Sequence, residues 1–208
     1  MIRGEEIVAG VLLAAGMSTR MGRPKQLLPA GDGTLIEGIL KEALRSDLDR
    51  VILVLGHRHE EIRALLGKER RNPKLKLILN RRFKEGMSSS IKAGLSEVET
   101  SSNHLMILLG DMPFVDANLI NRLIRHYLDS GLPLGAVKIK LRRSHPVIIG
   151  RELYHELHKI SGDVGARSLF EKYNDRVCLV EPEGLYDDRD VDTPEDYTRY
   201  IKNLDRMK

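Results

Sequence analysis

The sequence predicts an α/β protein with three layers, αβα, in which a mostly parallel sheet lies between helices. Short apolar runs rich in Val, Ile and Leu alternate with segments whose apolar residues recur at helical spacing. The connections between these segments are short, which favours βαβ units with helices on both faces of the sheet. The alternation breaks within residues 131–190. We therefore expect a Rossmann-like fold with an antiparallel excursion in its second half.

The first half of the chain carries the clearest signals. Continuous apolar runs predict four buried strands, at Ile7–Leu13, Val51–Leu55, Leu75–Leu79 and Leu105–Leu109. Segments with apolar residues on one helical face predict the connecting helices, at Leu35–Leu44, His59–Leu66 and Ser88–Val98. Ligands of such sheets bind beyond the carboxyl ends of the strands. That rule predicts a site near Ala14, Gly56, Asn80 and Gly110.

The second half is less regular. Its clearest element is a helix over Asp116–Tyr127, with Asp116 as the N-cap. Strands are predicted at Leu134–Lys140, Val147–Ile149 and Val177–Val180. Helical segments are expected to begin near Glu152 and Gly165, and a last helix begins at Pro194, a residue favoured in the first helical turn.

Length and composition exclude several classes of protein. The 208 residues predict a single domain spanning 1–208, and one cysteine excludes a disulfide framework or a Cys-rich metal site. A net charge of +4 with no Trp and 4% aromatic residues predicts no nucleic-acid partner. No apolar run reaches the roughly 20 residues that span a bilayer, so no membrane partner is expected. The first ten residues lack the pattern of an export signal, which predicts a cytoplasmic protein.

The loop after the first strand carries the strongest functional signal. It runs from Ala14 to Lys25 and combines small residues, which allow close backbone approach, with Arg20 and Lys25. Backbone N–H groups in such a loop can bind phosphate, and the two cations add fixed positive charge. The spacing of Gly16 and Gly22 fits neither the Walker loop nor the G-x-G-x-x-G dinucleotide fingerprint. The loop therefore predicts a phosphate site of another kind.

A family resemblance covers nearly the whole chain. Leu13–Pro29, LAAGMSTRMGRPKQLLP, resembles the L-A-[AG]-G-x-S-x-R-M-G-x-x-K-x-L-L signature of the MobA-like nucleotidyltransferases. Later segments resemble further motifs of that family: Asn80, Glu85–Ile91, Gly110–Pro113, His145–Val147, Gly162–Arg167 and Asp190–Tyr197. In this order they resemble most closely the CTP:molybdopterin cytidylyltransferase (MocA) branch.

The resemblance implies a reaction. CMP would be transferred from CTP to the terminal phosphate of molybdopterin, the organic part of the molybdenum cofactor, and pyrophosphate would be released. The product would be molybdopterin cytosine dinucleotide, which a recipient molybdoenzyme would receive through a transient contact. The attacking phosphate is already an anion, so the reaction needs charge neutralisation and positioning rather than a general base.

The resemblance also implies a metal site. Asp111 follows the strand Leu105–Leu109 and is expected to bind Mg²⁺, with Mn²⁺ as an alternative ion. The simpler interpretation of Asp111 is an Asx-turn or a helix cap. Asp190 is expected to be the second metal ligand, and Asp192 a helix cap or a support. The residues alone leave open which of these two aspartates binds metal.

Nucleotide binding is expected mainly from residues 1–115. Lys25 and Arg20 would act with Asp111 as the catalytic residues by stabilising the triphosphate and the leaving pyrophosphate. Ala15 stands where related guanylyltransferases have Gly, and the resemblance associates that change with cytosine. The full set of expected nucleotide contacts is Leu13, Ala14, Ala15, Gly16, Lys25, Asn80, Gly86, Ser90 and Asp111.

Acceptor binding is expected mainly from residues 116–208. A glycine loop before a helix is a natural anion site, and the expected acceptor contacts are His145, Gly162, Asp163, Gly165 and Arg167. Asp163 could instead be only an N-cap, and His145 could be structural.

Other functions stay open at this point. The first is guanylyl transfer to the same cofactor, and the second is nucleotidyl transfer to another phosphorylated acceptor. The third is a nucleotide-binding regulatory or chaperone module without catalysis. A dehydrogenase is excluded by the missing dinucleotide fingerprint. The sequence does not give the acceptor, the oligomeric state or the recipient molybdoenzyme.

Overall fold

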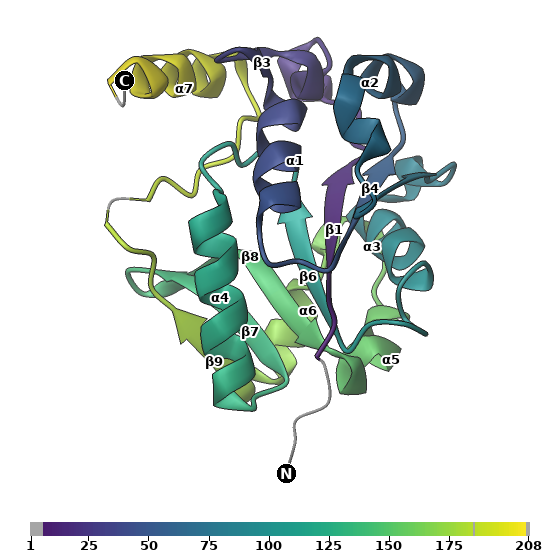
Figure 1. The fold of residues 1–208 in the computed structure, drawn as a ribbon, viewed down its shortest axis with the longest axis vertical. Helices are drawn as coiled ribbons and strands as arrows, with labels where there is room; N and C mark the ends of the chain where they lie inside the picture. Colours follow the sequence, from purple (N-terminus) through teal and green to yellow (C-terminus); the bar gives the residue numbers. More distant parts are fainter. Residues whose placement is uncertain (1–5, 185, 207–208) are drawn as a thin grey trace.

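A seven-stranded sheet forms the centre of the protein in a computed structural model that describes residues 6–184 and 186–206 (Figure 1). Its strand order is β5–β4–β1–β6–β8–β7–β9. The strands are β1 (Val8–Ala14), β4 (Arg50–Leu55), β5 (Leu75–Leu79), β6 (His104–Leu109), β7 (Leu134–Ile139), β8 (Arg142–Gly150) and β9 (Val177–Val180). Within the described residues, β8 is antiparallel to β6 and β7, and the other neighbouring pairs are parallel. The predicted parallel sheet with an antiparallel excursion is confirmed.

Helices cover both faces of the sheet. On one face lie α1 (Leu35–Arg45), α2 (His59–Leu65) and α4 (Ala117–Ser130), and Figure 1 shows α1 and α4 in front of the strands. The other face is covered by α3 (Met87–Ser96), α5 (Tyr154–Leu157) and α6 (Arg167–Lys172). Each face of the sheet packs against its helices in a separate hydrophobic core. Neighbouring residues of β1 point into different cores, since Leu12 packs into one and Val11 into the other. The sheet is therefore buried on both sides, as its continuous apolar runs predict.

The clearest predicted helix is also the best capped. The carboxylate of Asp116 accepts a hydrogen bond from the backbone N–H of Leu119 at 2.8 Å, which confirms Asp116 as the N-cap of α4. The helix ends at Gly131, whose φ of 65° is a left-handed conformation that glycine adopts without strain.

The second half differs in detail from the prediction. Strand β8 begins at Arg142 rather than at Val147. The prediction starts too late because the first residues of the strand are charged and do not belong to the apolar run. The helical segment expected from Glu152 is a 3₁₀ turn at Arg151–Leu153 followed by the single turn of α5. The segment expected from Gly165 begins as α6 only at Arg167.

Two short elements that the sequence does not predict lie beside the first loop. Strands β2 (Pro29–Ala30) and β3 (Gly33–Thr34) form a small antiparallel hairpin. Each has only two residues, which is too short to show a period.

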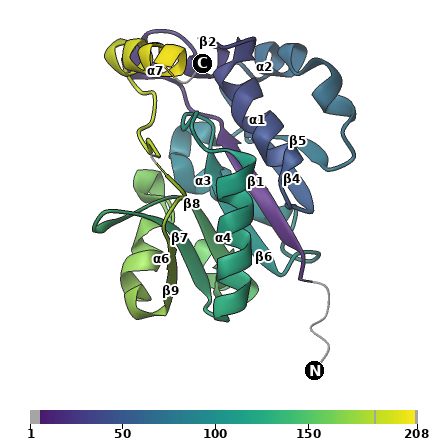
Figure 2. The same ribbon diagram turned by 60° about the vertical axis from the view of Figure 1, so that its left-hand side comes forward.

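The last helix, α7 (Pro194–Arg206), lies at the end of the molecule toward which β1 and β6 point (Figures 1 and 2). Tyr200 of α7 packs with Met21, Leu28 and Leu35 in a separate small core, and Tyr197 donates a hydrogen bond to the carbonyl of Pro29 at 2.9 Å. The end of the chain therefore braces the loop that follows β1.

Among the described residues, none of the helices combines the length and the apolar character that crossing a membrane requires.

Candidate active site

A cavity of about 520 Å³ opens where β1 and β6 end, and we call it the strand-end cavity. Many of the residues predicted for nucleotide and metal binding line it. These are Leu13, Ala15, Gly16, Arg20, Lys25, Gly86, Ser90, Asp111 and Asp190. Asp192 and Asp163 lie on the same wall. The topology thus brings residues from opposite ends of the sequence to one edge of the sheet.

Side chains from within the loop hold its shape. Ser18 adopts a left-handed conformation, and its hydroxyl accepts a hydrogen bond from the backbone N–H of Lys25 at 3.1 Å. The same hydroxyl donates to the carboxamide of Gln26 at 3.2 Å. Gln26 is buried although it is polar, because this internal partner replaces water. These contacts direct the side chain of Lys25 into the cavity.

Lys25 lies among three carboxylates. Its ammonium donates to Asp111 and to Asp192, at 2.5 Å in each case. Arg20 binds the other oxygen of Asp192 at 2.7 Å. Asp111, Asp190 and Asp192 each offer an oxygen, and these oxygens lie within 4.8 Å of one another. We call these three residues the carboxylate cluster.

The cluster shifts the ionisation of its members. Burial alone would lower the pKa of Lys25, but Asp111 and Asp192 outweigh it and raise the pKa above the usual 10.5. Burial and the negative charges of Asp192 and Asp111 raise the pKa of Asp190. Burial opposes ionisation of Asp192 too, yet hydrogen bonding and charge from Lys25 keep its pKa below the usual value. The cations therefore stabilise the ionised form of Asp192 more than that of Asp190.

The cluster fits a divalent metal ion. Hard cations such as Mg²⁺ and Mn²⁺ prefer carboxylate oxygens, and three converge here. One oxygen of Asp111 is buried and has no hydrogen-bond partner within the described part of the chain. A buried, unpaired carboxylate oxygen is costly unless a ligand compensates it. Asp111, Asp190 and Asp192 are thus the residues that could hold such an ion.

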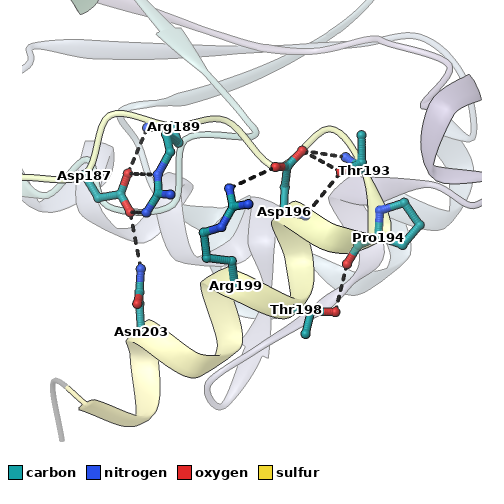
Figure 3. Close-up of polar contacts among 8 residues, drawn as sticks. All are labelled: Asp187, Arg189, Thr193, Pro194, Asp196, Thr198, Arg199 and Asn203. Carbon is teal, nitrogen blue, oxygen red and sulfur yellow. Dashed lines mark hydrogen bonds and ion pairs between the residues drawn. The ribbon is translucent and has the colours of Figure 1, made fainter.

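Asp192 does not cap α7, although the sequence predicts a capping or supporting role for it. Figure 3 shows that Thr193 and Asp196 form the cap instead. The backbone N–H of Thr193 donates to the carboxylate of Asp196 at 3.0 Å, and the backbone N–H of Asp196 donates to the hydroxyl of Thr193 at 3.2 Å. This reciprocal cap leaves both oxygens of Asp192 available to Lys25 and Arg20.

Asn80 and Ala14 do not line the strand-end cavity. The carboxamide nitrogen of Asn80 donates to the hydroxyls of Ser89 and Ser90, at 2.8 and 3.0 Å. Its oxygen accepts from the backbone N–H of Arg82 at 2.9 Å. Since its polar atoms are used inside the protein, Asn80 orients the start of α3 and places Ser90 on the cavity wall.

A second cavity of about 730 Å³ adjoins the first, and we call it the hairpin cavity because the β7–β8 hairpin forms one wall. Met87 and Asp163 line both cavities. Three of the other predicted acceptor residues line the hairpin cavity, namely His145, Gly165 and Arg167. Arg167 is 80% exposed and pairs with Glu171 at 2.8 Å.

Burial favours the neutral form of His145. Burial lowers its pKa below the usual 6.5, against the opposing influence of the Ile107 backbone and of Asp111. Its ring nitrogen Nδ1 is buried and has no hydrogen-bond partner among the residues that the structure describes.

The two cavities meet where two loops touch. Asp163 accepts a hydrogen bond from the backbone N–H of Met87 at 3.1 Å, so it caps α3 rather than the helix that follows it in sequence. Gly86 has φ of 94°, and a Cβ on it would lie 2.5 Å from the carbonyl carbon of Gly162. Gly162 itself lines neither cavity but packs against Gly86.

Some cavity residues are not predicted from the sequence. Met17, Thr19, Gln26, Phe83, Lys84 and Leu109 also line the strand-end cavity. Phe83 and Lys84 stand directly before the predicted Glu85–Ile91 segment, which is the signal that could have identified them.

A larger cavity, of about 880 Å³, lies between α4 and the chain around Tyr186–Arg189. It holds none of the carboxylate cluster, and three of its four lining cations, Arg122, Arg142 and Arg189, pair with Glu183, Asp188 and Asp187. We therefore place the chemistry in the smaller strand-end cavity.

Comparisons with known proteins agree with this geometry. The model of the MobA-like NTP transferase domain matches residues 10–177. Nicotine blue oxidoreductase of Paenarthrobacter nicotinovorans is 31% identical over 93% of this chain and 96% of that protein. Molybdenum cofactor cytidylyltransferase of Escherichia coli is 26% identical over 90% of this chain and 92% of that protein.

A solved structure extends the similarity to a metal complex. Rv0371c of Mycobacterium tuberculosis, complexed with manganese, is 27% identical and superposes with a TM-score of 0.78. The match covers 94% of this chain and 98% of that one. A protein of similar fold and related sequence therefore binds a divalent cation, which agrees with the carboxylate cluster.

Proposed function

The chain belongs to the MobA-like NTP transferase family and is a nucleotidyltransferase, and we propose that it transfers CMP from CTP to the terminal phosphate of molybdopterin. Pyrophosphate and molybdopterin cytosine dinucleotide would be the products. Residues 1–208 would form one domain, with nucleotide bound mainly by residues 1–115 and acceptor mainly by residues 116–208. The observation that carries the proposal is the meeting of Lys25 and Arg20 with three carboxylates in one cavity.

Charge neutralisation is the main task of the strand-end cavity. A nucleoside triphosphate brings several negative charges, and Lys25 and Arg20 are placed to balance them. Asp111, with Asp190 and Asp192, would hold Mg²⁺ or Mn²⁺. When bound, such an ion supplies Lewis-acid stabilisation of the charge that develops on the phosphates.

The preference for cytosine rests on the shape of the cavity near Ala15. The position of Ala15 corresponds to Gly in the guanylyltransferase motif, and Ala15 lines the strand-end cavity, where its methyl group would favour the smaller base. A Cβ on Gly56 would lie 2.8 Å from the Cβ of Ala15 and also 2.8 Å from that of Phe83. The lack of a side chain at Gly56 therefore makes room for Ala15 and Phe83 beside the cavity.

The hairpin cavity suits an anionic acceptor. Its walls carry four cations, Lys138, Arg142, Arg143 and Arg167. Three of them have carboxylate partners, Glu181, Asp188 and Glu171, which the acceptor phosphate would have to replace. The neutral ring of His145 and the apolar side chain of Phe170 provide surfaces for a planar, partly polar ring system. Because Met87 and Asp163 line both cavities, an acceptor here would present its phosphate toward the nucleotide.

The rim of the hairpin cavity would also contact the recipient molybdoenzyme. Leu141, Val164 and Leu179 are exposed there. Exposed apolar side chains around a cavity mouth are typical of transient protein contacts.

Parallel turnover assays test the proposal. Purified protein, Mg²⁺ and molybdopterin are incubated with CTP, GTP, ATP or UTP, and pyrophosphate release is measured. We expect CTP to be preferred by at least about tenfold, because that is the discrimination one steric contact can supply. A tenfold preference for GTP would contradict the cytidylyl assignment. Pyrophosphate release only with other phosphorylated acceptors would move the assignment to those, and none with any acceptor would favour a regulatory module.

An oxidoreductase is the competing function from another class, and the 31% identity to nicotine blue oxidoreductase favours it. Oxidation of NADH or NADPH by dyes tests it directly. The chain lacks the G-x-G-x-x-G fingerprint, so we expect that adding a dye causes no loss of the absorbance of NADH or NADPH. Dye reduction without pyrophosphate release would reverse the assignment.

A further inference from the structure

Lys25 occupies the centre of the carboxylate cluster. Its side chain is only 13% exposed, and its ammonium bridges Asp111 and Asp192 with 2.5 Å contacts on both sides. Arg20 engages the remaining oxygen of Asp192. Two of the three carboxylates are thus already neutralised by cations of the chain itself.

We propose that Lys25 is a resident counter-ion that makes metal binding depend on the nucleotide. Without nucleotide, its ammonium holds one oxygen of Asp111 and one of Asp192, two of the oxygens that a divalent ion could use. When a triphosphate enters, its oxygens offer Lys25 and Arg20 new partners, and the two aspartates become free to bind metal. This inference rests on the proposed nucleotidyl transfer and adds that metal and nucleotide bind with strong positive coupling.

The charges of the site support this coupling. With all three carboxylates ionised, the cluster has three negative charges against the two positive charges of Lys25 and Arg20. A divalent ion entering beside an unmoved Lys25 would meet a single net negative charge and direct repulsion from the ammonium. Lysine is a compact point charge on a flexible stem, so it can swing from carboxylate to phosphate at little cost.

The coupling is reciprocal by thermodynamic necessity. If nucleotide tightens metal binding by a given factor, then metal tightens nucleotide binding by the same factor. A metal-free nucleotide and a nucleotide-free metal should therefore both bind weakly.

Binding of Mn²⁺ to nucleotide-free protein tests the proposal. Free Mn²⁺ is measured by electron paramagnetic resonance in titrations of wild type, Lys25→Met, Lys25→Arg and Lys84→Met. We expect Lys25→Met to bind Mn²⁺ at least about tenfold more tightly than wild type, because a repelling cation is removed from among the ligands. Equal or weaker binding by Lys25→Met would overturn the proposal.

The other variants separate this effect from a general loss of charge. Lys84 lines the same cavity but forms no ion pair with the three carboxylates in the described part of the chain, so Lys84→Met should stay within about twofold to threefold of wild type. Lys25→Arg keeps the charge and should also stay near wild type. Similar tightening in Lys84→Met and Lys25→Met would show that total charge matters and not the position of Lys25.

Arg20→Gln is the second test if Lys25→Met fails to fold. Arg20 is 71% exposed, so its loss leaves the core intact. We expect a smaller tightening of Mn²⁺ binding, of about twofold to fivefold, because its exposed charge is screened by water. No tightening in Arg20→Gln when Lys25→Met is unfolded would also overturn the proposal.

Addition of an unreactive nucleotide tests the coupling itself. Water-proton relaxation distinguishes Mn²⁺ on the slowly tumbling protein from Mn²⁺ on free nucleotide. With the α,β-methylene analogue of CTP, wild type should gain at least about tenfold in Mn²⁺ affinity, and Lys25→Met should gain clearly less. If only an analogue of another nucleotide gives the gain, the choice of CTP fails and the counter-ion role stands. If Lys25→Met gains as much as wild type, the counter-ion role fails.

Discussion

The strand-end cavity and the hairpin cavity are neighbours that share Met87 and Asp163, yet they are built differently. In the strand-end cavity, Lys25 pairs with Asp111 and Asp192, and these three charges are mostly withdrawn from water, whereas Arg20 and Asp190 are exposed. In the hairpin cavity, Arg167 and several apolar side chains stand exposed at the rim. One cavity is organised before any ligand arrives, and the other offers an adaptable surface.

The difference follows from the elements that form each cavity. The strand-end cavity is based on β1 and β6, two central parallel strands buried on both faces. The hairpin cavity is based on the exposed end of the β7–β8 hairpin and on α6, a helix of only six residues. Rigid central strands suit chemistry that needs fixed charges, whereas a peripheral hairpin suits selection of an acceptor.

The largest expected effect comes from removing the negative charge of Asp111 from the carboxylate cluster. Asp111→Asn should lower the rate of pyrophosphate release by at least about a thousandfold, because the cluster loses a ligand charge that no other residue replaces. The thermal unfolding midpoint should stay within a few degrees of wild type. Asp175→Asn, at an exposed position that lines neither cavity, serves as the matched control. A rate for Asp111→Asn within tenfold of wild type would refute its role.

The next largest effect is expected from disturbing the contact between Gly86 and Gly162, where the two cavities meet. In Gly86→Ala, the new methyl group would meet the Gly162 backbone at 2.5 Å, at a φ of 94° that alanine avoids. We expect a loss of about 2 kcal/mol in the free energy of unfolding and higher KM values for both substrates.

Gly38→Ala is the control for that substitution. Gly38 lies in α1, and a methyl group placed on it would meet no neighbouring atom of the described residues within 4 Å. The same change there should therefore raise stability by about 0.5–1 kcal/mol. Unfolding in urea measures both variants. Equal stability of Gly86→Ala and wild type would show that the two loops are not tightly joined.

A smaller effect concerns the pH dependence of stability. Burial keeps the folded-state pKa of His145 below its usual 6.5, so the unfolded chain binds a proton there more readily. Its contribution to stability is therefore complete above about pH 6.5 and is lost as the pH falls further, by at most about 1.4 kcal/mol per pH unit.

Urea unfolding from pH 7.5 to 5 tests this in His145→Gln. The variant should lose part of the decline toward low pH, and His155→Gln, at an exposed histidine, should keep it. An unchanged pH profile in His145→Gln would mean that the histidine takes up its proton equally well in the folded protein.

The smallest expected effect is at the rim of the hairpin cavity. Arg167→Ala removes an 80% exposed side chain whose partner is Glu171 one helical turn away, so stability should change by less than about 0.5 kcal/mol. The KM for the acceptor should rise by about twofold to fivefold, and that for CTP should not change. A hundredfold effect on turnover would place Arg167 with the preorganised charges and break the contrast between the two cavities.

The parallel half of the fold is readable from sequence because its strands are buried on both faces. A run such as Val51–Leu55 has no polar residue to obscure it, and β4 forms there. The start of β8 is hidden by Arg142 and Arg143, since an exposed hairpin end tolerates charge. The hairpin of β2 and β3 has only two residues in each strand, and it contacts α1 and, through Tyr197, α7.

The candidate site also contains some residues that sequence patterns locate and others that they do not. The position of Asp111 in the strand-end cavity was predictable because it comes two residues after a strand, at the carboxyl end where ligands bind. The cap of α7 was assigned to Asp192, although Thr193 and Asp196 have the spacing of a reciprocal cap. Asp163 shows a deeper limit, since it caps a helix 76 positions earlier in the chain. Local patterns show that a residue can cap, but they do not show which helix it reaches.

The ion pair between Lys25 and Asp192 joins residues 167 positions apart, which has a consequence for how the protein is made. At about 5–20 residues per second, a ribosome needs roughly ten to thirty seconds to travel from one to the other. During that time the nascent chain holds Lys25 and the glycine loop but lacks both Asp192 and the α7 helix that braces them. The carboxylate cluster therefore cannot form in a newly made molecule until Asp192 has been synthesised.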